Sequence, residues 1–160
     1  MSLGANEWSA IASAIAAIGS VAVAVLTYRQ QSKNNKQTEI NKLTDRLISL
    51  AARANSHKNK PDGALRSFED AADLAYAVDT ATFRIFAVSR KYKLDENQIE
   101  DLKSYFINYL SYQIIEEMRL KEMPAFEMNA SYGIDEVSHI QFLWQRGVGY
   151  LMFNKLIQTA

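Results

Sequence analysis

The sequence has no cysteine among its 160 residues, and this absence excludes disulfides, thiolate catalysis and cysteine-bound zinc. It also lacks the glycine-rich phosphate-binding motifs GxxxxGK and GxGxxG, and the catalytic motifs GxSxG and HExxH. Nothing in the sequence indicates catalysis, a cofactor or a small-molecule substrate. We therefore expect a protein that is not an enzyme and uses no cofactor.

Histidine is scarce, with two residues in the chain. Glu136 and His139 form an ExxH pair, the spacing with which ferritin-like bundles bind iron. Such a centre needs a second ExxH helix and two further glutamates, whereas His57 has no glutamate three residues before it. Half of the ligand set is missing, so we expect no metal site. Asp135 and Glu136 fit the start of a solvated helix, where they favour the dipole.

An excess of charge of one sign is also absent, because the formal net charge is zero. Locally, residues 29–60 hold eight basic and two acidic residues, whereas residues 61–160 hold ten basic and fifteen acidic ones. The aromatic residues Tyr105, Phe106, Tyr109 and Tyr112 have no basic residues interleaved among them, which is typical of a core and not of a base-stacking surface. We expect no nucleic-acid partner.

Charge is completely missing from residues 8–28, WSAIASAIAAIGSVAVAVLTY. About 20 mostly apolar residues suffice for a helix to cross the hydrocarbon core of a bilayer. Trp8 and Tyr28 stand at the two ends, where aromatic side chains prefer the headgroup level. No Lys or Arg precedes the segment, so a cleaved signal peptide fits poorly. The pattern predicts a transmembrane anchor, and the alternative is a buried helix of a soluble bundle.

Basic residues follow the apolar segment at once, in the order Arg29, Lys33 and Lys36. The positive-inside rule then predicts a single-pass protein of the cytoplasmic membrane, with its N-terminus outside and its C-terminal domain in the cytoplasm. These juxtamembrane basic residues also favour contact with anionic membrane lipid.

Small residues recur along one side of the same segment at helical spacing. In lipid, such a pattern lets helix backbones approach closely and associate. We therefore expect a helix-association face, through which the anchor pairs with itself or with a partner's helix, formed by Ser9, Ala12, Ala16, Ser20 and Ala24.

Apolar residues at steps of three and four predict four helices after residue 39. The first carries Leu43 and Leu47 and ends before the turn signal NKPDG, while residues 29–39 are either its continuation or a flexible link. The second is expected over 62–92 with Asp62 as its cap, and the third over 96–123 with Asp95 as its cap and Pro124 behind its end. The last is expected over 135–158, where Gly147 and Gly149 permit a close helix contact or a break.

Two charged clusters accompany these helices. Local ion pairs on a solvated face explain the run Glu116, Glu117, Arg119, Lys121 and Glu122. A second group is either an inward polar network or surface charge, and consists of Asp70, Asp73, Asp79 and Arg84.

The predicted organisation is all-α, with an anchor over residues 1–28, a polar basic segment over 29–39 and an antiparallel bundle of about four helices over 40–160. Its expected function is interaction or assembly at the membrane, with membrane lipid and either a second copy or another protein as partners. Two alternatives stay open. One is a membrane-perturbing effector, toxin-like or defence-related, whose first helix clusters in the bilayer. The other is a soluble helical adaptor with a buried or partner-covered first helix.

Overall fold

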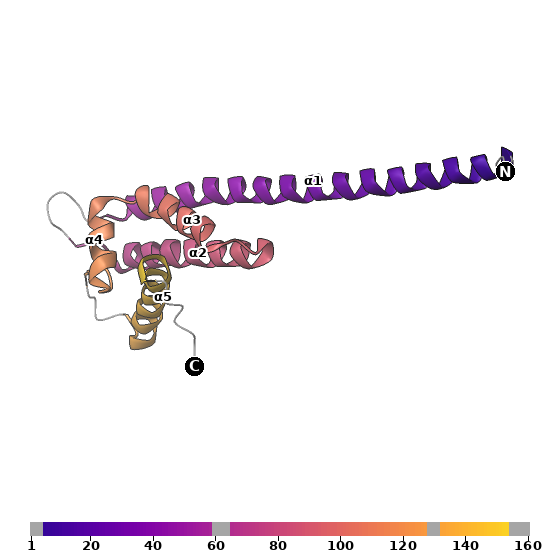
Figure 1. Ribbon diagram of the computed structural model, residues 1–160. Helices are drawn as coiled ribbons and strands as arrows, with labels where there is room; N and C mark the ends of the chain where they lie inside the picture. Colours follow the sequence, from indigo (N-terminus) through magenta and orange to yellow (C-terminus); the bar gives the residue numbers. More distant parts are fainter. Residues whose placement is uncertain (1–4, 59–64, 128–131, 154–160) are drawn as a thin grey trace. The chain divides into compact units, whose positions relative to one another are not determined.

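The computed structural model describes the backbone of residues 5–58, 65–127 and 132–153, and the side chains of these residues except 5–12, 14 and 15. Within these ranges every extended element is an α-helix, and the one β contact is an isolated bridge between Arg66 and Phe126, which confirms the predicted all-α class (Figure 1). The helices are α1 (Ala5–Ser56), α2 (Phe68–Tyr92), α3 (Glu96–Asn108), α4 (Tyr112–Leu120) and α5 (Ile134–Phe153).

The chain divides into two compact units, Met1–Glu39 and Ile40–Ala160. Helix α1 belongs to both, because it continues through residues 29–39 without a break. The polar segment is therefore the helical continuation and not a flexible link. In the second unit, α1 buries the side chains of Leu43, Leu47, Ala51 and Ala54, which recur at helical spacing.

The start of α2 lies later than predicted. Asp62 falls outside the described residues, but residues 65–67 are not helical and the helix begins at Phe68. Ser67 is the N-cap, and its hydroxyl accepts a hydrogen bond from the amide of Asp70 at 3.1 Å. At the other end Lys93 adopts a left-handed conformation, with φ 48°, and closes α2 close to the predicted position.

The predicted helix over 96–123 is wrong, because the structure has two helices there. Asp95 caps α3 as expected, in a capping box with Gln98. The helical path is interrupted at residues 109–111, and the Asn55 side chain forms hydrogen bonds with the backbone there. The Asn55 Nδ2 atom donates to the Tyr109 carbonyl at 2.8 Å, and its Oδ1 atom accepts from the Ser111 amide at 2.7 Å. Helix α4 ends at Leu120, before Pro124 is reached.

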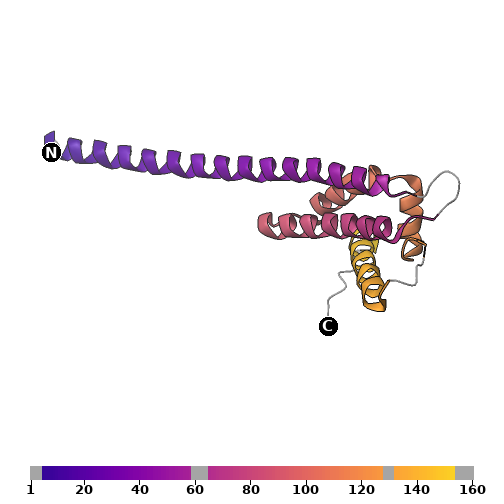
Figure 2. The same ribbon diagram turned by 180° about the vertical axis from the view of Figure 1, so that it is seen from behind.

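Helix α5 starts at Ile134, one residue before the predicted position, and its expected last residues lie outside the described range. It crosses α2 and packs against it (Figure 2). At the crossing, a Cβ atom on Gly147 would lie 2.8 Å from the Val78 Cγ1 atom and 3.1 Å from the Asp79 amide nitrogen. Thr82 donates to the Gly147 carbonyl at 3.2 Å. The predicted close helix contact at Gly147 is thus confirmed.

Candidate functional site

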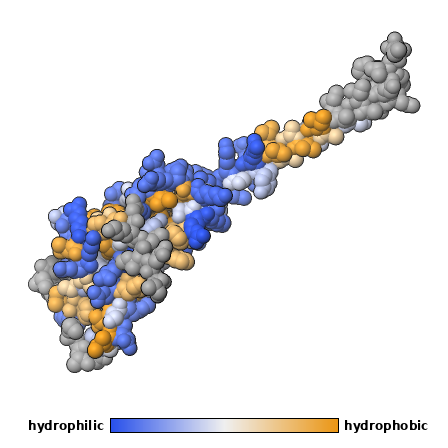
Figure 3. All heavy atoms as spheres, turned by 60° about the horizontal axis from the view of Figure 1, so that its bottom comes forward, coloured by the Kyte–Doolittle hydropathy of each residue, from blue (hydrophilic) through white to orange (hydrophobic). Residues whose placement is uncertain are grey.

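The first candidate surface is the apolar part of α1, residues 16–28. Every described side chain from Ala16 to Tyr28 is exposed, and Ile18 and Leu26 keep 71% and 65% of their surface accessible. Figure 3 shows this stretch as a run of hydrophobic residues followed by hydrophilic ones. Extended exposed apolar surfaces are typical of the places where proteins contact other proteins or membranes.

Among the residues with described side chains, no helix has a stretch long and apolar enough to cross a membrane.

The predicted helix-association face is only partly described. Ser9 and Ala12 lie outside the residues with described side chains, whereas Ala16, Ser20 and Ala24 are exposed. The Ser20 hydroxyl donates to the carbonyl of Ala17 at 2.8 Å, within its own helix. The hydroxyl donor of Ser20 is therefore satisfied within the helix. The described part of the face consists of small side chains.

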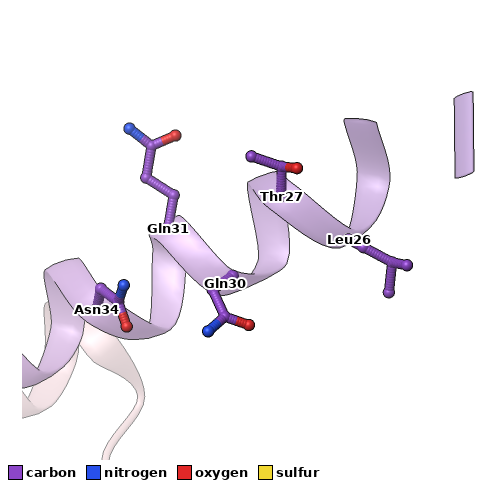
Figure 4. A pocket seen from close by; sticks show the side chains of 5 residues that line it. All are labelled: Leu26, Thr27, Gln30, Gln31 and Asn34. Atoms are coloured by element: carbon purple, nitrogen blue, oxygen red, sulfur yellow. The ribbon is translucent and has the colours of Figure 1, made fainter. Parts of the chain in front are cut away.

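The three basic residues that follow the apolar segment lie on one side of α1. Successive helical residues are rotated by about 100°, so Arg29, Lys33 and Lys36 fall within roughly a quarter of the circumference. The side chains of Arg29 and Lys33 are exposed, and that of Lys36 is half-buried. A hollow of about 500 Å³ lies beside them, lined by Leu26, Thr27, Gln30, Gln31 and Asn34 (Figure 4). All five come from this single helix, so the hollow has no second wall with which to enclose a ligand.

Asp79 belongs to an inward ion pair at the crossing of α2 and α5. The Arg146 Nε and Nη2 atoms donate to its two carboxylate oxygens at 2.7 and 2.6 Å. Donation of these hydrogen bonds to the Asp79 carboxylate raises the pKa of Arg146 above its ordinary value, so the guanidinium stays charged. It fixes the crossing beside Gly147 and thus has a structural role.

Asp70 and Asp73 form a second cluster, which joins the end of α1 to the start of α2. The His57 Nδ1 atom lies 2.8 Å from Asp70 Oδ1, and Nε2 lies 3.5 Å from Asp73 Oδ2. Arg53 pairs with Asp73 at 3.0 Å. The hydrogen bond with His57 lowers the pKa of Asp70 below its ordinary value of 3.8. Three of the four predicted residues are therefore divided between two clusters, and Arg84 takes part in neither of them.

The charged run after residue 115 is only partly local, which corrects the prediction. Glu116 and Arg119 do pair within α4, at 2.7 Å. Glu117 instead forms a two-bond pair with Arg66, at 2.9 and 3.0 Å. The Arg66 side chain is 1% exposed and comes from the segment before α2. Arg66 could not be identified from the sequence, because nothing near it in the sequence indicates a partner 51 residues away.

The prediction that the tyrosines between residues 105 and 112 belong to a core is wrong. Phe106 is fully buried, but Tyr105, Tyr109 and Tyr112 are exposed. Tyr105 and Tyr109 line a hollow of about 250 Å³ together with Asp101, Ser104 and Asn108. Lys103 occupies an interior position instead, where it pairs with Glu100 at 2.8 Å and lies over the Tyr150 ring. Helical spacing identified the aromatic cluster but not which members face inward.

Glu136 and His139 are both exposed at the start of α5. The Glu136 Oε2 atom accepts from the Gly133 amide at 3.2 Å and so caps its own helix. The His139 ring lies 6.3 Å from the Tyr76 ring. Within the described residues, no three His, Cys, Asp or Glu side chains are arranged to hold a metal ion.

No family model matches the chain, and neither a curated protein nor a solved structure is significantly similar to it.

Proposed function

We propose that this chain is a non-enzymatic, single-pass membrane protein that assembles with itself or holds a partner protein at the cytoplasmic membrane. Residues 8–28 are the anchor, the N-terminus lies outside, and the helices after residue 39 form a cytoplasmic interaction body. Arg29, Lys33 and Lys36 face the anionic headgroups of the inner leaflet.

The observation that supports this proposal best is the distribution of uncovered apolar side chains around α1. Ile18 and Val21 point to one side of the helix, whereas Val23 lies nearly opposite, and all three are exposed. A helix that docks on one partner surface needs only a stripe of apolar residues. Apolar residues on all sides suit lipid, which surrounds the helix completely.

The length of the uncharged segment supports the same proposal. Its twenty-one residues, as a helix, extend about 32 Å at 1.5 Å per residue, against a hydrocarbon core of about 30 Å. The helix then continues through residues 29–39, so a charged helical segment follows the anchor without an intervening loop.

The test is extraction of membranes from expressing cells with alkaline carbonate. We expect the chain to remain in the pellet until detergent is added. The double variant Ile18→Asp, Val21→Asp should be released, because each central carboxylate costs about 2.5–3.5 kcal/mol in a spanning helix. The matched control Gln30→Asp, Asn34→Asp places the same charges outside the segment and should stay in the pellet. Release of the unchanged chain by carbonate would refute the anchor.

Orientation can be tested with single cysteines, because the chain has none of its own. A membrane-impermeant maleimide should label Asn6→Cys on intact cells and label Asn97→Cys only after lysis. The reverse pattern would refute the proposed topology while leaving the anchor in place.

A further inference from the structure

One side of α2 faces away from the core of the second unit. We call it the α2 stripe, and its residues follow each other at steps of three and four along the helix: Glu69, Ala72, Tyr76, Thr80, Phe83, Ala87 and Arg90. All seven are exposed or half-buried, and Tyr76 and Phe83 keep 44% and 66% of their surface accessible. The buried residues of α2 lie on its other sides, which pack against α5 and the core.

The α2 stripe has the same order of aromatic and small residues when it is read from either end. About a centre between Asp79 and Thr80, Tyr76 is the counterpart of Phe83 and Ala72 is the counterpart of Ala87. At the two ends, Glu69 is the counterpart of Arg90, which has the opposite charge. In a two-fold interface every contact between two different residues occurs twice, once on each side of the axis. An antiparallel pair of α2 helices would therefore match aromatic with aromatic, small with small, and acid with base.

We propose that the α2 stripe pairs with the α2 stripe of a second copy of this chain, antiparallel and about a two-fold axis at the middle of α2. Tyr76 and Phe83 supply the apolar contact area at the centre. The alanines beside them let the helices approach closely. The terminal charges set the direction, because a parallel pair would place Glu69 against Glu69 and Arg90 against Arg90.

A hollow of about 490 Å³ at the start of the stripe independently favours this occupant. It is lined by Glu69, Asp73 and Glu136 together with Phe68, Ala72 and Tyr132. The Phe68 and Tyr132 rings stack at 4.2 Å and form an aromatic wall. Antiparallel pairing carries Arg90 of the second copy to this end of the stripe. The acidic lining of the hollow is complementary in charge to that guanidinium.

The inference rests on the self-association in the proposed function and specifies its surface, but the stripe belongs to the second unit alone. It can therefore fail, or hold, independently of the anchor. We choose mild detergent for the test because it keeps the full chain in solution and lets two copies approach in any orientation.

The first experiment mixes two full-length variants, Ala72→Cys and Ala87→Cys, under mild oxidation. Antiparallel pairing brings these positions together, so we expect a mixed disulfide. Each variant alone should cross-link at least tenfold less, because like positions would be about 22 Å apart along the helices, and a disulfide requires Cα atoms within about 7 Å. Cross-linking of each variant with itself as readily as in the mixture, or no cross-linking in any sample, would overturn the inference.

A charge exchange provides the second experiment. In the cysteine backgrounds, Glu69→Arg or Arg90→Glu alone should reduce the mixed disulfide severalfold, and both in one chain should restore it. Phe83→Ala should reduce it at least tenfold. Tyr112→Ala, which truncates an aromatic residue that is 76% exposed outside the stripe, should leave it unchanged. Equal loss in all variants, with unchanged helicity, would overturn the pairing.

The two proposals fail in distinguishable ways. A chain that resists carbonate but forms no mixed disulfide retains the anchor and loses the α2 pairing. A chain that carbonate releases but that forms the mixed disulfide retains the pairing and loses the anchor.

Discussion

The two halves of α1 have the same backbone geometry and opposite surroundings. In the second unit, Leu47 is completely buried and its neighbours one turn away are buried with it. In the first unit, Leu26 is 65% exposed, and the apolar residues around it are exposed too. The difference is in pattern, because the buried half has one apolar stripe and the exposed half is apolar on every side. The second unit buries the stripe with its own helices, whereas the apolar surface of the first unit is exposed.

Truncation of one leucine in each half should give the largest difference between the halves in the free energy of unfolding. Leu47→Ala should lower the free energy of unfolding of the bundle by about 2–5 kcal/mol, since it opens a cavity in a packed core. Leu26→Ala should change it by less than about 0.5 kcal/mol. Urea unfolding in mild detergent, followed by fluorescence of the buried Trp144 in a Trp8→Phe background, measures both. Equal losses would mean that the first unit is packed against the bundle.

A pair of glycines gives a smaller contrast. Gly147→Ala pushes a methyl group against Val78 and the backbone of α2, which costs about 1–3 kcal/mol and is only partly offset by the better helix propensity of alanine. Gly19→Ala meets nothing within 4 Å, so it should not destabilise the bundle. The same urea measurement decides the matter. A neutral Gly147→Ala would show that α2 and α5 can separate without loss.

Acid should affect the two units differently, and this is the smallest of the expected effects. The pKa of Asp70 is lowered by its bond with His57, so this contact stabilises the fold above pH 3.8 and is lost as the pH falls further. Asp70→Asn should remove part of the stability difference between pH 5 and pH 2, measured by thermal unfolding at each pH. Residues 8–28 carry no carboxyl group, so their variants should keep the full difference. An unchanged acid dependence in Asp70→Asn would exclude this contact as a source.

Features that depend on neighbouring residues could be predicted from the sequence. Asp95 was identified as a cap because its side chain reaches an amide three residues away, and the structure has that bond. The helical spacing of Leu43 and Leu47 predicts that both belong to a core, and both are buried. The small-residue face and the basic residues after Tyr28 were also read from local pattern, and their roles stay predictions.

Local sequence was sufficient for the helical class, for the uncharged segment and for the start of α3 after its cap Asp95. The break in the third predicted helix depends on tertiary contacts, because the groups that bond the backbone at Tyr109 and Ser111 come from Asn55. The tertiary structure also decided that Glu117 pairs with Arg66 and that three tyrosines face outward. The physical reason is the same in each case. A helical period specifies which residues share a side, but burial and pairing depend on what another part of the chain brings to that side.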